Sequence, residues 1–134
     1  MRRFLKSHWQ AIAAASFTLP AVAFIAICLV LGSGVRGAIA DAQSHHPGEP
    51  ISALLAVAAD GNLEPAVRNR AIWALGQLGR SEAVPVLKSL AAPGPCDHER
   101  SLCQHEIAKA MAACSGGRNI GAVIWRHGEL AAAR

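Results

Sequence analysis

The chain has 134 residues, of which 52% are hydrophobic, and it contains no tyrosine and only three phenylalanines. This length leaves room for one small domain plus a targeting segment, and the shortage of aromatic residues disfavours a β-sandwich. The net charge is +4, but from residue 37 onward nine basic residues balance nine acidic ones. Because a nucleic-acid partner requires a basic face on the domain, we expect no nucleic-acid binding.

The N-terminal part of the chain has the composition of a membrane-spanning helix. No charged residue lies in residues 10–35, and residues 11–31 would form a helix of about 31 Å, which matches a hydrocarbon core of roughly 30 Å. Three basic residues precede this segment: Arg2, Arg3 and Lys6. By the positive-inside rule they place residues 1–9 in the cytoplasm. We therefore predict a transmembrane helix or signal anchor that contacts membrane lipid, in a bacterial inner membrane, with the following domain in the periplasm.

A second interpretation of the same segment is a cleaved signal peptide. Ala38-Ile39-Ala40 is a small-residue site of the kind that signal peptidase prefers, and Asp41 follows it. Both interpretations export the rest of the chain. The sequence alone leaves open whether the segment is removed.

Residues 36–50 are predicted to be a linker, because they are polar and contain no sustained apolar period. Residues 51–59 predict a short helix, with Pro50 suited to its first turn. The sequence Asp60-Gly61-Asn62 ends this helix with residues that favour turns. We interpret the short helix as the second half of an incomplete first repeat.

Residues 65–92 predict two amphipathic helices joined by a short turn, which is a helical hairpin. Their apolar residues recur at steps of three and four: Val67, Ala71, Ala74, Leu75 and Leu78, and then Val84, Leu87, Leu90 and Ala91. This stretch resembles a HEAT-like repeat, with the pattern VRxxAxxALGxLG on the first helix and AVxxLxxxL on the second. The resemblance implies a helical-repeat architecture, a basic residue (Arg68 or Arg70) that ties neighbouring hairpins together, and no particular reaction.

The pattern returns after about 36 residues, a spacing typical of helical-hairpin repeats. The offset places the stripe of the first helix on Cys103, Ile107, Ala110, Met111 and Cys114. We expect helices over residues 97–113 and 120–132. The predicted fold is therefore all-α: a short right-handed α-solenoid of about 2.5 HEAT-like hairpins over residues 51–134. So few units leave apolar ends exposed, which favours a partner or a homo-oligomer.

The cysteines of the exported part allow one disulfide. Cys103 and Cys114 are too far apart along one helix, whereas Cys96 lies in a loop that can fold back, so a Cys96–Cys103 bridge is possible. The other interpretation is that the three cysteines are small core or loop residues with free thiols. The alternative is a thiol- or metal-dependent redox sensor that uses Cys96, His98 and Cys103. Zinc is disfavoured because Cys103 and His105 would point to opposite sides of a helix.

The leading functional hypothesis is a non-enzymatic, membrane-tethered scaffold or adaptor without a cofactor, since no acid–base constellation is present. Its partner would be an envelope or membrane protein that the sequence does not identify. The candidate contact residues are Trp73, Lys88, Trp125 and Arg126. A less favoured hypothesis comes from lyase subunits that attach bilin pigments to antenna proteins, because these contain HEAT-like repeats of similar sequence.

Overall fold

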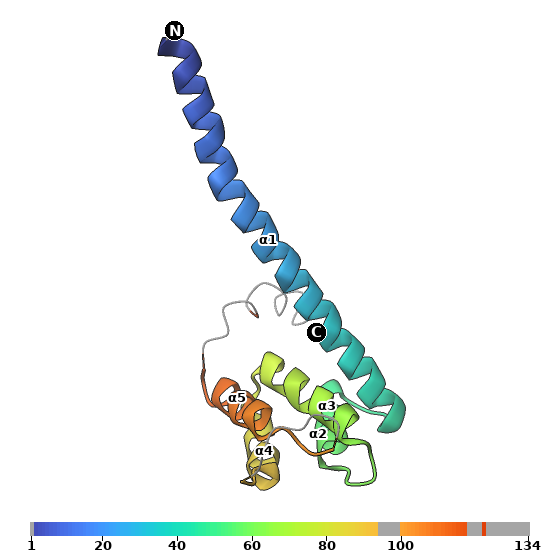
Figure 1. The fold of residues 1–134 in the computed structure, drawn as a ribbon. Coiled ribbons are helices and arrows are strands. Elements are labelled where there is room, and N and C mark those ends of the chain that lie inside the picture. Colours follow the sequence, from blue (N-terminus) through green and yellow to red (C-terminus); the bar gives the residue numbers. More distant parts are fainter. Residues whose placement is uncertain (1, 94–99, 118–121, 123–134) are drawn as a thin grey trace.

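The computed structural model describes residues 2–93, 100–117 and 122, with side chains from Thr18 onward. Its elements are α1 (Arg2–His45), α2 (Pro50–Ala59), α3 (Pro65–Leu78), the 3₁₀ helix η1 (Ser81–Ala83), α4 (Val84–Leu90) and α5 (Gln104–Cys114). No strand occurs in these described ranges, so the all-α prediction is confirmed. The N-terminal half of α1 projects away from the other helices, which gather against its C-terminal half (Figure 1). The handedness of the solenoid stays a prediction, and the helix predicted over residues 120–132 lies outside the described residues.

Helix α1 is longer than the sequence predicts, and the linker is correspondingly shorter. The helix continues to His45, so only residues 46–49 connect it to α2. The added part is helical because it carries a buried stripe of small residues, Val35, Ala38 and Ala42, at helical spacing. Helices α2 and α3 both pack against it. Part of the predicted linker therefore belongs to the hydrophobic core.

The turns on either side of α2 are fixed by side-chain hydrogen bonds. Glu49 caps the N-terminus of α2, since its Oε2 accepts from the backbone N–H groups of Ile51 and Ser52. At the other end, Nε of Arg68 on α3 donates to the carbonyl oxygen of Ala58 at 3.1 Å. The resemblance implied such a tie between neighbouring hairpins, and Arg68 supplies it through a backbone carbonyl at a helix C-terminus.

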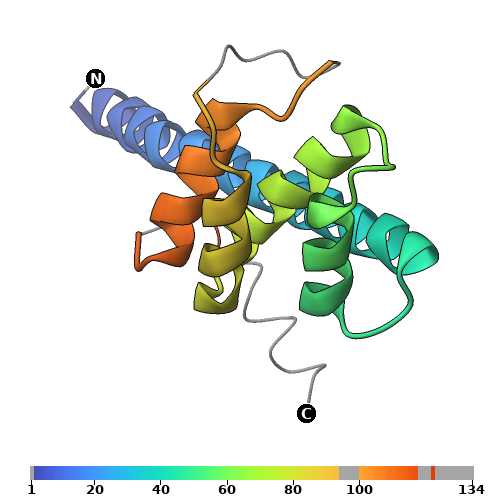
Figure 2. The ribbon, with the colours of Figure 1, turned by 90° about the horizontal axis from the view of Figure 1, so that it is seen from below.

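Helices α3 and α4 form the predicted hairpin. Gly79 ends α3 in the left-handed conformation, with φ of 61°, which glycine adopts without steric cost. Ile72 and Leu75 on α3 and Leu87 on α4 are fully buried. Viewed from below, α4 lies beside α5, and both lie under α1 (Figure 2). The hairpin is therefore the centre of the core, with α1 and α2 on one side and α5 on the other.

Helix α5 begins later than predicted, at Gln104 instead of near Asp97. Asn69, a buried polar residue on α3, explains the shift. Its Oδ1 accepts from the backbone N–H of Cys103 at 2.9 Å, and its Nδ2 donates to the carbonyl oxygen of Ser101 at 3.0 Å. These bonds hold the chain before α5 in a non-helical conformation, and Cys103 becomes the N-cap residue.

Gly76 sets the close approach of α3 and α5. A methyl group placed on it would lie 2.9 Å from Cα and 3.0 Å from Cβ of Ala110 on α5. Real Cβ atoms essentially never come so near to backbone atoms. The close packing of α3 against α5 therefore requires glycine at position 76, because a protein interior packed as densely as a crystal has no room for an added methyl group.

Gly76→Val should therefore destabilise the protein by about 1–3 kcal/mol, the usual cost of forcing added volume into a packed core. The measurement is chemical unfolding of the detergent-solubilised full chain. Ala112→Val adds similar bulk on the exposed face of α5 and should cost only about 0.5 kcal/mol. Equal losses in the two variants would contradict the close packing at Gly76.

Candidate interaction surface

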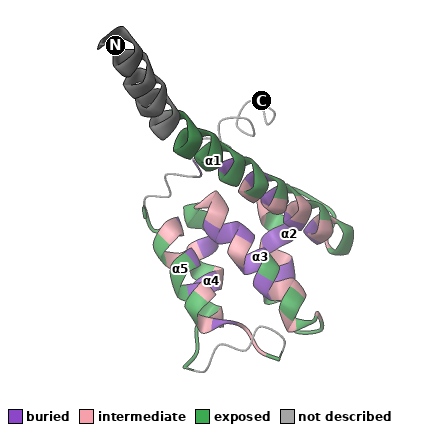
Figure 3. Cartoon of the chain, turned by 45° about the horizontal axis from the view of Figure 1, so that its top comes forward, coloured by how far each residue is buried: buried purple, intermediate pink, exposed green. Residues whose placement is uncertain are grey.

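Helix α4 presents one face to the core and one to the surroundings. Leu87 is buried, while Pro85, Lys88 and Ser89 are exposed (Figure 3). The hydroxyl of Ser89 donates to the carbonyl oxygen of Val86 at 2.7 Å, so it is satisfied within the helix. The exposed face of α4 carries Lys88, which the sequence analysis singled out as a contact residue and which is in none of the ion pairs of the described residues.

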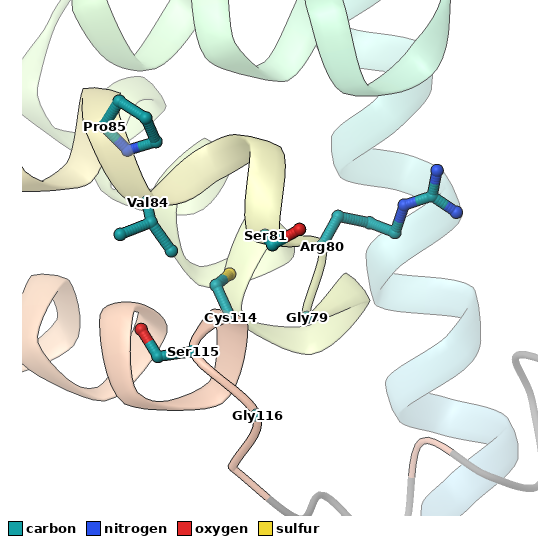
Figure 4. Close-up of a pocket in the computed structure, with 8 residues that line it drawn as sticks. All are labelled: Gly79, Arg80, Ser81, Val84, Pro85, Cys114, Ser115 and Gly116. Carbon is teal, nitrogen blue, oxygen red and sulfur yellow. The ribbon is translucent and has the colours of Figure 1, made fainter.

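An open hollow of about 660 Å³ lies next to this face, where α3 and α5 both end. Its lining residues are Gly79, Arg80, Ser81, Val84, Pro85, Cys114, Ser115 and Gly116. Figure 4 shows the side chain of Arg80 directed away from the other lining residues. Its guanidinium binds Glu82, with Nε 3.2 Å from Oε2, and this carboxylate raises the pKa of Arg80. The interior of the hollow is consequently small, partly apolar and uncharged.

The chemistry of the hollow suits binding more than catalysis. Cys114 is buried, and its Sγ lies 3.4 Å from the carbonyl oxygen of Leu75, which accepts from the thiol. A buried thiol of this kind behaves as a small apolar residue. Within the described residues, no three or more His, Cys, Asp or Glu side chains cluster so as to hold a metal ion. What remains is a shallow depression bordered by the exposed face of α4.

A family model of HEAT repeats matches residues 25–113. The chain belongs to the HEAT-repeat family. HEAT repeats are generally protein-interaction modules. No curated protein and no solved structure matches the chain.

The HEAT match begins at residue 25, inside α1, and not at α2. The C-terminal half of α1 lies within the match and packs against α2. The division of the chain into repeats, with an incomplete first repeat, stays a prediction.

The other predicted contact residues of this HEAT-repeat protein are placed differently from Lys88. Trp73 is only partly exposed, because it packs against α1, where a methyl group on Gly34 would lie 3.1 Å from its Cη2 atom. Trp125 and Arg126 lie outside the described residues. The structure thus brings Lys88 to the exposed face of α4 and Trp73 to the α1–α3 contact, and these two residues do not form one patch.

The cysteine and histidine predictions concern the segment before α5. Cys103 is buried at the N-cap position of that helix, and Cys114 is buried at its last residue, as predicted. Cys96 and His98 lie outside the described residues. The Cys96–Cys103 disulfide and the thiol or metal sensor therefore stay predictions.

The sequence analysis missed an ion pair between His46, which follows α1, and Asp60, which follows α2. Nε2 of His46 lies 3.3 Å from Oδ2 of Asp60, and the backbone N–H of Asn62 donates to Oδ1 of Asp60 at 2.9 Å. The bond from Asn62, with a further contribution from His46, lowers the pKa of Asp60 below its ordinary value of 3.8. His46 lies fourteen residues before Asp60, so no local pattern could indicate the pair.

The lowered pKa of Asp60 predicts a pH dependence of stability. Because the folded-state pKa lies below 3.8, the ionised carboxylate stabilises the fold above about pH 4, and this contribution is lost as the pH falls through the folded-state pKa. Asp60→Asn should therefore lower Tm at pH 7 and have a smaller effect at pH 3. Gly61→Ala, a neutral change in the same turn, should give a difference that is independent of pH. A loss from Asp60→Asn that is equal at both pH values would contradict the assignment.

Proposed function

We propose that this HEAT-repeat chain is a non-enzymatic interaction module tethered to the bacterial inner membrane, with its repeats on the extracytoplasmic side. The observation that carries the proposal is the division of α1 into two parts. Its N-terminal part exposes large apolar side chains: Leu19, Val22, Phe24, Ile25, Ile27, Leu29 and Val30, each at least 44% exposed. Its C-terminal part is packed into the repeats. Cys28 is the buried exception in this run. A helix surface of large, exposed apolar side chains is stable in lipid and costly in water.

The length and charge of α1 agree with this placement. Within the described residues, α1 is the one helix that is long and apolar enough to cross a membrane. The basic residues at its N-terminal end favour a cytoplasmic N-terminus. Topology can be tested with a C-terminal tag: protease should remove the tag from spheroplasts but not from intact cells. A tag that stays protected in spheroplasts would contradict the extracytoplasmic placement.

The packing of α1 also favours an uncleaved anchor. Ala38, which occupies the predicted signal-peptidase site, is 3% exposed within a continuous helix. Proteases act preferentially on exposed, mobile segments. Cleavage after Ala40 would require α1 to separate from α2 and α3.

The surface proposed to bind an envelope or membrane protein is the exposed face of α4 together with the adjacent hollow. A photoreactive residue can be placed at Lys88 on this face and, as a matched control, at the exposed Asn62 in the α2–α3 turn. Irradiation of intact cells should give a discrete crosslinked product from position 88 and none from position 62. Crosslinking to a second copy of this chain would show that the chain forms a homo-oligomer through this face. Absence of any product specific to position 88 would contradict the use of this face.

A further inference from the structure

Two glycines of α1 allow side chains of α3 to lie directly against it. A methyl group on Gly34 would be 3.1 Å from Cη2 of Trp73, and one on Gly37 would be 3.0 Å from Nη2 of Arg70. Residue numbers fall along α3 as they rise along α1, so the two helices run in opposite directions at this contact. Trp73 and Arg70 are therefore held at fixed heights along α1.

These heights correspond to the edge of a membrane. If residues 11–31 span the hydrocarbon core, as the proposed function requires, Gly34 and Gly37 lie about 4.5 Å and about 9 Å beyond its end, at 1.5 Å per residue. The headgroup layer on each side of a bilayer is roughly 5–7 Å thick. Trp73 therefore lies within this layer, and the guanidinium of Arg70 lies about 2–4 Å beyond its outer limit. Because α1 is a continuous helix from the membrane to the repeats, the distance of Trp73 and Arg70 from the membrane does not vary with the conformation of a linker.

The side chains at this level have the chemistry of the headgroup layer. Tryptophan is favoured at membrane interfaces, where its apolar ring and polar N–H are both accommodated. Arg36 and Arg70 are exposed, and guanidinium groups on long stems reach phosphate oxygens and bind them in pairs. No acidic residue occurs in α3 or in α1 before Asp41. Among the ion pairs of the described residues, none involves Arg36 or Arg70, so both can bind an external anion.

The neighbouring arginines are different. Nε of Arg68 is bonded to the carbonyl oxygen of Ala58, and Arg80 is paired with Glu82. Arg68 and Arg80 are thus bonded to groups of the protein itself. Arg36 and Arg70 lie at the level of the membrane surface and have no carboxylate beside them in sequence.

We infer that Arg36, Arg70 and Trp73 form a juxtamembrane band at the outer surface of the headgroup layer, where it binds anionic phospholipid. The inference rests on the proposed anchoring through α1. It goes further by assigning the lipid surface as the second partner of the repeats. The band would fix the orientation of the HEAT domain, so that the exposed face of α4 is always presented in the same direction relative to the bilayer.

The test uses the full chain in nanodiscs of phosphatidylcholine with or without phosphatidylglycerol, a lipid with an anionic headgroup. Phosphatidylglycerol should raise Tm of the native chain, and Arg36→Gln with Arg70→Gln should abolish that rise. Arg100→Gln with Lys109→Gln removes the same number of charges from exposed positions before and on α5 and should leave the rise intact. Equal responses of the two double variants would overturn the inference. So would an equal rise produced by inorganic phosphate in phosphatidylcholine alone, because the site would then bind a free anion and not a lipid surface.

The position of the band is tested by fluorescence. In a chain with Trp9→Phe and Trp125→Phe, the emission of Trp73 should be quenched more by lipids brominated near the headgroup than by lipids brominated at the chain end. Emission that neither lipid quenches would place Trp73 away from the membrane. Resistance of the chain to extraction by alkaline carbonate is measured in parallel. An extracted chain contradicts the anchor itself, whereas a resistant chain with unquenched Trp73 contradicts only the band.

Discussion

A chain that begins at Asp41 should lose its cooperative fold. This truncation is the product that cleavage after Ala40 would release, and it removes Val35 and Ala38, which are 0% and 3% exposed. At about 0.8 kcal/mol for each buried methyl or methylene group, the side chains alone account for roughly 3 kcal/mol. The remaining residues 41–45 are too few to form a stable helix, so the surfaces of α2 and α3 beneath α1 would also be exposed. A domain of this size has only about 5–15 kcal/mol to lose.

The control for this truncation is a chain that begins at Cys28. It lacks the exposed apolar part of α1 and keeps the packed part. Urea unfolding followed by far-UV circular dichroism should give a cooperative transition for residues 28–134 and a shallow, non-cooperative change for residues 41–134. Matching midpoints and slopes for the two chains would show that α1 is dispensable for the repeats.

The same packing determines the species expected in cells. If α1 is a repeat helix as well as an anchor, the chain isolated from membranes should have the full mass of 14.0 kDa. A product that lacks residues 1–40 would contradict the uncleaved anchor. Experiments that capture a partner should therefore use a chain that keeps the C-terminal half of α1, because the binding surface of a shorter fragment would be disrupted.

Local patterns in the sequence were sufficient to predict the hairpin. Three features depend only on neighbours within a few residues: the apolar stripe of residues 65–92, the turn at Gly79 and the HEAT-like sequence pattern. The structure and the family match agree with them. The 36-residue offset also identified core positions correctly, since Cys103, Ile107, Ala110 and Cys114 are buried. The stripe residues were placed without knowledge of their partners because burial follows helical period.

The features that sequence analysis missed depend on distant contacts or on small residues. Ala38 and Ala42 were assigned to a linker because alanine and glycine give a weak apolar signal and polar residues lie between them. The later start of α5 depends on Asn69, more than thirty residues away. The contact of Trp73 with α1 depends on α1 and α3 running side by side, which the period of neither helix can indicate. A better signal was available in the glycines of α1, since Gly34 and Gly37 are three residues apart and mark a face where another helix can approach.

Asn69→Ala should be among the most destabilising single substitutions in this chain, with a loss of about 2–4 kcal/mol. The side chain is 7% exposed. It accepts from the backbone N–H of Cys103 and donates to the carbonyl oxygen of Ser101. A buried donor or acceptor that loses its partner costs about 1–3 kcal/mol. Amide exchange should become faster at Cys103 and in the first turn of α5, because the substitution releases the segment that begins this helix.

Two further variants separate the hydrogen bonds from the packing. Asn69→Leu keeps the side-chain volume and removes both bonds, so a loss close to that of Asn69→Ala would assign the effect to the bonds, whereas a small loss would assign it to the cavity. Asn62→Ala makes the same chemical change at an exposed turn and should cost about 0.5 kcal/mol or less. If Asn69→Ala cost no more than Asn62→Ala, the start of α5 would be held by packing alone. The junction between the second and third repeats would then need no buried polar residue.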